Sequence, residues 1–109
     1  MRQFTELTSI EQIDTFIKNH ALAFLYISQP NCSVCHGLKP QVQELMEKFP
    51  HIHLAEVNTT TVPEVAGRLS IFTVPVLLLF VYEKEYIREA RIVHMDLFER
   101  KLLKIYENM

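Results

Sequence analysis

The chain has 109 residues, a length that allows one domain, residues 1–109, with a single core of modest size. Hydrophobic residues make up 49% of it and charged residues 22%, and the net charge is −2. With Lys and Arg scattered among Glu and Asp, this composition predicts no basic surface for nucleic acid and no polybasic patch for a membrane.

Two further features bear on the cellular compartment. The apolar stretches Ala21–Ile27 and Val74–Tyr82 are too short to cross a bilayer, and the first six residues lack the apolar core of a signal peptide. The chain also has only two cysteines, so it has no framework of structural disulfides. We therefore expect a protein of the reducing cytoplasm.

The chain begins with a predicted strand over residues 2–7. A helix follows, because Ser9 or the preceding threonine can act as an N-cap and apolar residues recur at helical spacing to about His20. Ala21–Ser28 is nearly all apolar, which is typical of a strand covered on both faces. The next three residues, Gln-Pro-Asn, break this strand and lead to Cys32.

A second helix is expected to begin at the two cysteines and to end before Pro50, because apolar side chains recur along it at helical spacing. Pro40 lies inside this pattern, where it removes a helix hydrogen bond and should bend the axis. His51–Asn58 is then predicted to form a strand. A short helix capped by Thr61 is expected to run to about Leu69.

The last third of the chain changes from alternating elements to a hairpin and a helix. Val74–Val81, opened by Pro75, predicts one strand, and Tyr86–Val93 predicts a weaker, alternating one. The connection Tyr82–Glu85 is short enough to make these strands antiparallel, and Asp96 can cap a terminal helix. The order βαβαβαββα predicts an α/β fold, with a central mixed β-sheet flanked by four helices.

The cysteines provide the chemical signal. Cys32 and Cys35 are spaced Cys-Ser-Val-Cys, directly after a strand and at the expected start of a helix. Two intervening residues let the thiols close a small disulfide ring, and a helix N-terminus favours the reactive thiolate. In a chain with no other cysteine, this pair favours a redox function.

Other interpretations of the cysteine pair are open. The sequence from Cys32 to His36 also fits the attachment site of a c-type haem, which would need export and a large cavity. A structural zinc site would need two further ligands, and the other four histidines show no ligand spacing and are expected to be solvated. The two cysteines could also be inert thiols. We expect no bound cofactor or metal.

These residues resemble the thioredoxin family. The matching pieces are the Cys32–Cys35 motif, Pro40 five residues after the second cysteine, and Val74-Pro75 at the start of a strand. The order and spacing of the elements also agree from about Phe4 to the C-terminus. The resemblance implies a thioredoxin-like fold and a cis peptide bond between Val74 and Pro75 that lies against the disulfide.

The resemblance also implies roles for individual residues. Cys32 would be the exposed nucleophile, with a pKa below the value of about 8.5 of a free thiol, and would form a mixed disulfide with the substrate. Cys35, deeper and more buried, would then resolve that intermediate. Pro75 would turn the backbone before it toward an extended substrate strand. The residues implied to bind substrate are Asn31, Ser33, Val34, Thr73, Val74 and Pro75.

The implied activity is that of a thiol–disulfide oxidoreductase that reduces or exchanges disulfides in proteins or in low-molecular-weight compounds. Electrons would come from an unidentified donor, such as a thioredoxin reductase or a thiol pool. Two alternatives remain. One is a redox-responsive binding protein with a thioredoxin fold and no efficient turnover, and the other is a structural module with dormant cysteines.

The chain departs from the family beside the cysteines. The family usually has Trp immediately before the first cysteine and a buried Asp six residues before it, but here the residues are Asn31 and Tyr26. That Asp is thought to deprotonate the resolving cysteine, and a phenol with a pKa near 10 cannot act as a carboxylate base at neutral pH. Glu56 could approach Cys35 from below and partly replace it, or could be solvated at a strand edge. His36 would favour a thiolate if protonated, or could be an exposed side chain with little effect.

Overall fold

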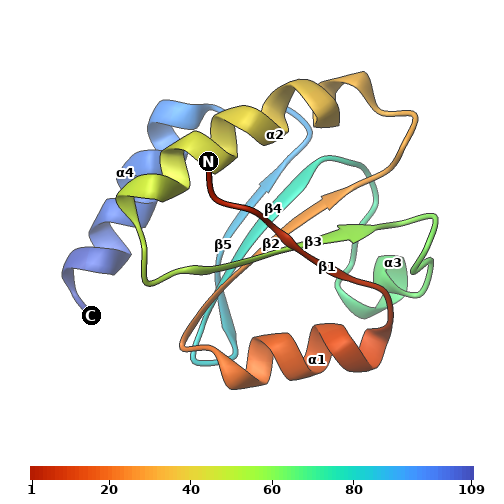
Figure 1. The fold of residues 1–109 in the computed structure, drawn as a ribbon, viewed down its shortest axis with the longest axis horizontal. Coiled ribbons are helices and arrows are strands. Elements are labelled where there is room, and N and C mark those ends of the chain that lie inside the picture. The colour runs from red at the N-terminus through yellow and green to blue at the C-terminus, as the bar shows by residue number, and fades with distance from the viewer.

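A five-stranded mixed sheet forms the centre of the computed structural model, which describes residues 1–109 (Figure 1). β1, β3 and β2 run parallel, whereas β4 is antiparallel to both of its neighbours, β2 and β5. The predicted α/β class with a central mixed sheet is confirmed. In spatial order the strands are β1 (Thr5–Leu7), β3 (His53–Asn58), β2 (Leu22–Ser28), β4 (Val76–Val81) and β5 (Lys84–Ala90).

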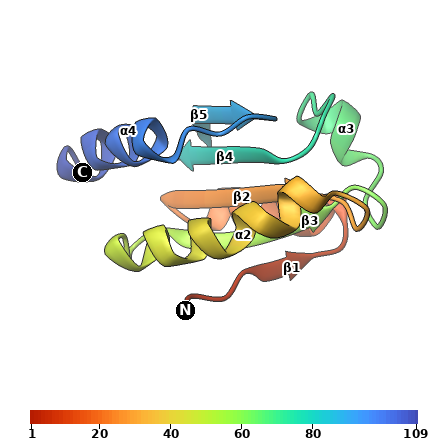
Figure 2. The same ribbon diagram turned by 90° about the horizontal axis from the view of Figure 1, so that it is seen from above.

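Four helices cover the two faces of this sheet, as expected. Figure 1 shows α2 and α4 on one face and α1 and α3 on the other, and Figure 2 shows α2 and α4 beside the strands from above. Each face has its own buried apolar cluster, one of 17 and one of 14 residues. None of the helices is long and apolar enough to span a membrane. The helices are α1 (Ile10–Asn19), α2 (Ser33–Leu45), α3 (Val65–Arg68) and α4 (Met95–Glu107), and a 3-10 turn, η1 (Met46–Lys48), follows α2.

The two central strands are buried on both faces. Every residue of 22–27 in β2 and every residue of 76–81 in β4 is buried, which accounts for their almost uninterrupted apolar sequences. Burying each such Leu, Ile or Val side chain contributes about 1.5–3 kcal/mol. These two strands therefore hold the sheet in the core and position the loops that leave their ends.

The beginning of the chain is attached to the end of the second helix. The guanidinium of Arg2 donates hydrogen bonds to the carbonyl oxygens of Met46, Phe49 and Ile52, at 3.1, 2.9 and 2.6 Å. These contacts tie the start of the chain to η1 and to the turn that follows it. They also explain why β1 begins only at Thr5, although a strand was predicted from residue 2: the preceding residues contact α2 and η1 instead.

Helix starts were predicted with mixed success. Of Thr8 and Ser9, the two residues predicted as possible caps, Ser9 is the N-cap of α1, and its side-chain oxygen accepts the Gln12 N–H at 3.1 Å. The prediction for Thr61 is wrong, because its N–H donates to the Asn58 carbonyl in a turn and α3 begins only at residue 65. The prediction for Asp96 is also wrong by two positions. His94 is the N-cap of α4, and Asp96 lies in the first turn, where its charge suits the helix dipole.

The last strand begins two residues earlier than predicted. It runs from Lys84 to Ala90 rather than over 86–93, because the hairpin turn consists of Tyr82 and Glu83 alone. Both turn residues have a positive φ, 47° and 70°, as a two-residue hairpin turn of this kind requires. Such turns usually contain Gly or Asn, so this sequence gave no signal for one.

A pair of histidines lies at the other end of the sheet from the cysteines. The ring of His20, at the end of α1, stacks on that of His53, at the start of β3, with centroids 3.9 Å apart. Partial burial, followed by the charges of His20 and Arg2, lowers the pKa of His53. The fold therefore favours the neutral His53 ring.

This shift predicts a loss of stability in mild acid. Because the pKa of His53 is lower in the folded than in the unfolded chain, the unfolded chain binds more protons as the pH falls below about 6.5, and the free energy of unfolding decreases. We expect His53→Gln to reduce this decrease, measured by urea denaturation above and below that pH. His94→Gln, which changes a histidine that stacks on no other, is the control. An equal pH dependence in the wild type and His53→Gln would contradict the prediction.

Candidate active site

The two cysteines form a disulfide at the start of α2. Their Cα atoms are 5.2 Å apart, and Cys32 is the N-cap of the helix. The Cys32 sulfur accepts the backbone N–H of Cys35 at 3.1 Å, which is a contact that would favour negative charge on that sulfur. Cys32 is half-buried, whereas only 1% of the Cys35 surface is exposed. Only the first sulfur is thus open to a partner in solution.

Cys32 lies in an open groove of about 1050 Å³. The groove is bordered by the start of α2, by the loop that enters β4 and by the segment that follows β5. Cys35 and Glu56 do not line it. All the residues implied by the resemblance to bind substrate do line it, namely Asn31, Ser33, Val34, Thr73, Val74 and Pro75.

Pro75 forms part of the floor of this groove. The peptide bond between Val74 and Pro75 is cis, as the resemblance implied. Pro75 is buried, and its carbonyl oxygen accepts the backbone N–H of Arg91 at 2.9 Å. The segment after β5 is thereby held against the residue that enters β4.

A second, smaller cavity of about 240 Å³ lies on the buried side of the disulfide. It is lined by Cys35, Glu56 and Lys39, among others, and the Glu56 carboxylate pairs with the Lys39 ammonium at 2.9 Å. Glu56 is not at a sheet edge, because β3 lies between β1 and β2. The structure therefore brings this half-buried carboxylate to the same cavity as the buried cysteine.

Tyr26 lies beside that pair, in register with Glu56 on the neighbouring strand. Its side chain is fully buried, and its hydroxyl donates a hydrogen bond to the Cys35 carbonyl oxygen at 2.5 Å. Burial, followed by the negative charge of Glu56, raises the pKa of Tyr26 well above its usual value. The phenol is therefore a hydrogen-bond donor to the backbone of Cys35 and not a base.

His36 is exposed and contacts the loop before the cysteines. Its Nε2 lies 2.7 Å from the carbonyl oxygen of Pro30. Since a carbonyl can only accept a hydrogen bond, Nε2 carries the hydrogen. The ring thus connects the first turn of α2 to the loop that precedes Cys32.

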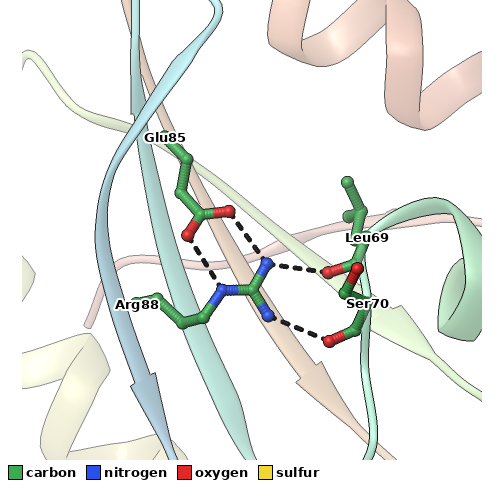
Figure 3. Close-up of polar contacts among 4 residues, drawn as sticks. All are labelled: Leu69, Ser70, Glu85 and Arg88. Carbon is green, nitrogen blue, oxygen red and sulfur yellow. Dashed lines mark hydrogen bonds and ion pairs between the residues drawn. The ribbon is translucent and has the colours of Figure 1, made fainter.

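The loop that forms the far wall of the groove is clamped to the edge strand β5 by Arg88 (Figure 3). The guanidinium of Arg88 donates two hydrogen bonds to the Glu85 carboxylate, both at 2.8 Å. It also donates to the carbonyl oxygens of Leu69, at 2.7 Å, and Ser70, at 3.1 Å. This loop continues to Pro75, so the clamp fixes one wall of the groove to the sheet.

Several residues of the site were not predicted from the sequence. Phe72 and Ile92, which line the groove, are 92% and 75% exposed, and Arg91 lies beside them. No periodic pattern singles out an apolar residue in a loop. The role of Lys39 was also not predicted, because a lysine on an amphipathic helix is ordinarily solvated. Its contact with Glu56 depends on the packing of α2 on β3.

Comparisons with known proteins agree with this geometry. A sequence model described as Thioredoxin matches residues 4–101. The chain is 49% identical over 106 residues to the thioredoxin-like protein YdfQ of Bacillus subtilis, covering 97% of this chain and 95% of that protein.

Solved structures show the same fold. Thioredoxin from Trypanosoma brucei brucei superposes with a TM-score of 0.85 at 15% identity, covering 96% of this chain and 92% of that one. Fasciola hepatica thioredoxin superposes with a TM-score of 0.81 at 20% identity, covering 92% and 98%. At these identities the structural comparisons show a shared fold and nothing more.

The clamp on the groove wall yields a prediction for stability. Arg88→Ala removes four hydrogen bonds with a charged donor, two of them to backbone carbonyls, and we expect it to lower the free energy of unfolding by about 1–2 kcal/mol. Urea denaturation measures this loss. Amide exchange at residues 69–73 should rise more than at β2.

Arg100→Ala is the matched control, because Arg100 is exposed and forms no ion pair. Equal stability of the two variants would show that the clamp contributes nothing.

Proposed function

The chain belongs to the thioredoxin family, and from this membership we propose that it is a thiol–disulfide oxidoreductase that reduces or exchanges disulfides through Cys32 and Cys35. Its substrates would be disulfide-containing proteins or low-molecular-weight disulfides. It would act as a single domain, 1–109, in a reducing cytoplasm, with electrons supplied by a thioredoxin reductase or a thiol pool and without a bound cofactor.

The proposed reaction proceeds in two exchange steps. The Cys32 thiolate attacks one sulfur of the substrate disulfide, so that a Cys32–substrate disulfide forms, the substrate S–S bond breaks and one substrate thiolate leaves. The Cys35 thiolate then attacks the Cys32 sulfur and releases the second substrate thiolate. Two electrons pass from the protein dithiol to the substrate, and an external dithiol must reduce the Cys32–Cys35 disulfide again.

The difference in burial between the two sulfurs is the observation that carries this proposal. Cys32 lies in the groove at the N-terminus of α2, where its sulfur accepts a backbone N–H, and Cys35 is almost fully buried behind it. This arrangement suits an attacking thiol and a resolving thiol. In this mechanism Asn31, Ser33, Val34, Thr73 and Val74 line the binding site, and Pro75 holds the substrate backbone beside the sulfurs.

We further propose that Glu56 accepts the proton of the Cys35 thiol. The two residues line the same cavity of about 240 Å³, which is large enough to hold a water between them. The Glu56 carboxylate also pairs with the Lys39 ammonium at 2.9 Å. Because Tyr26 is a donor and not a base, Glu56 is the carboxylate best placed for this step.

A second function has one observation in its favour. A buried phenol, Tyr26, occupies the position where the family usually has a buried Asp, so the resolving step could be slow. The protein would then be a redox-responsive binding protein that captures partners in the groove without efficient turnover. Catalytic reduction of insulin distinguishes the two functions, because a binding protein would exchange one equivalent and stop.

The first functional prediction concerns the two cysteines. Cys32→Ser should reduce the rate of insulin reduction by dithiothreitol to the uncatalysed rate, because it removes the nucleophile. Cys35→Ser should accumulate a mixed disulfide at Cys32, because no thiol resolves it, and mass spectrometry detects this species. Full activity of Cys32→Ser would rule out the mechanism, and stoichiometric reaction of the wild type without turnover would favour the binding protein.

The second functional prediction concerns Glu56. Glu56→Gln should slow the resolution of the mixed disulfide roughly tenfold or more at neutral pH, because a positioned proton acceptor is lost. The lifetime of the intermediate is measured by acid quenching and mass spectrometry. At alkaline pH the difference should shrink, because more of the Cys35 thiol ionises without help.

Glu44→Gln is the control, since Glu44 is an exposed glutamate on α2 that does not line the cavity. If Glu56→Gln resolves the intermediate as fast as Glu44→Gln at every pH, Glu56 has no part in the reaction.

A further inference from the structure

Arg91 is the one charged residue among the 18 that line the groove. No carboxylate of the chain forms an ion pair with its guanidinium. The groove is otherwise apolar or neutral, and the chain as a whole has a net charge of −2. A lone cation in the groove that holds Cys32 is therefore available to a negative charge on a substrate that enters the groove.

The backbone of Arg91 is held to the residue that enters β4. Its N–H donates to the carbonyl oxygen of Pro75 at 2.9 Å, and Pro75 lines the same groove as Cys32. Arg91 has a φ of 69°, a left-handed conformation that is uncommon for a residue other than Gly and is often found at functional sites. The backbone at this position is thus held by the fold, and the residue lines the groove.

The rim of the groove is apolar on three sides. Val34 at the start of α2, Phe72 in the loop before β4 and Ile92 after β5 are all well exposed. Together they surround far more space than a small disulfide occupies, since the groove measures about 1050 Å³. Exposed apolar side chains gathered around a groove are typical of a surface that binds a polypeptide.

We propose that this groove selects disulfides in apolar polypeptide segments that carry an Asp or Glu next to the reacting cysteine, and that Arg91 determines this preference. The proposal rests on the proposed function, because the selected step is the attack of the Cys32 thiolate on the substrate disulfide. In that step the Cys32–substrate bond forms, the substrate S–S bond breaks, and the departing sulfur leaves with the electron pair. The carboxylate of the substrate pairs with Arg91 before and during the attack.

The test uses three synthetic peptides of the same apolar sequence. Each has one cysteine joined to a neutral 2-thiopyridyl group, and the residue beside it is Glu, Gln or Lys. The probe protein is the full chain with Cys35→Ser, reduced beforehand with dithiothreitol, so that only the attack by Cys32 is measured from the release of pyridine-2-thione. We expect the Glu peptide to react roughly fivefold faster than the Lys peptide, as for an ion pair worth about 1 kcal/mol.

Charge variants then identify the residue responsible. Arg91→Glu should reverse the order of the Glu and Lys peptides, and Arg91→Gln should remove it, with the rate of the Gln peptide as the reference for each variant. Arg100→Glu makes the same charge change outside the groove and should leave the fivefold ratio unchanged. Salt at about 1 M should also reduce the ratio toward one, because it screens exposed charges.

The possible outcomes separate the two proposals. If the peptides react at equal rates, or if Arg91→Glu behaves like Arg100→Glu, the preference for an acidic substrate is overturned and the proposed function stands. If the 2-thiopyridyl disulfide of glutathione, which has the same leaving group, reacts as fast as the Glu peptide, the apolar rim does not recognise a polypeptide and the proposed occupant is wrong. If no disulfide reacts although iodoacetamide shows a free Cys32 thiol, both proposals fail.

Discussion

The antiparallel pairing of β4 with β2 is the constraint on which the candidate active site depends. Ile27, near the end of β2, pairs with Val76, the first residue of β4. The residues that follow β2 and those that precede β4 therefore meet at the same end of these strands. Cys32 and Pro75 come to line one groove as a result, although they are far apart in the sequence. Both strands are buried on both faces, so the hydrophobic core holds this meeting point while the loops outside it carry the chemistry.

The same sheet accounts for where charge lies on the buried side of the disulfide. Position 26 is in the middle of a fully buried strand, where an unpaired carboxylate would lose its hydration, and a neutral phenol occupies it. The carboxylate lies one strand away, at Glu56, which is in register with Tyr26 but only half-buried. Lys39 reaches it from α2. A charged pair is thus kept near Cys35 where the cost of burial is smaller.

The sequence was sufficient for the parts of the molecule that depend on local pattern. The apolar runs of β2 and β4, the cap at Ser9 and the cysteine spacing follow from period, propensity and turn chemistry, and the Val-Pro signal came through the family resemblance. The start of β5 could not be predicted, because Tyr82 and Glu83 form a turn of positive φ that Tyr and Glu rarely adopt. The Arg88 clamp and the contact of Lys39 with Glu56 depend on tertiary packing, which no local pattern specifies.

The left-handed backbone conformations of this chain show how tertiary contacts override local preference. Four residues other than Gly have a positive φ, while both glycines lie in helices. Each left-handed residue of this kind costs about 1 kcal/mol or more, so it persists only where neighbouring contacts hold it. Ser70 is held by the hydrogen bond from Arg88 to its carbonyl oxygen, and Arg91 by its own bond to the carbonyl of Pro75. Ser70 lies in the loop before β4 and Arg91 in the segment after β5, and both of these segments border the groove. Arg91 thus lines the groove and Ser70 lies in the loop that borders it, and contacts with neighbouring residues hold both left-handed conformations.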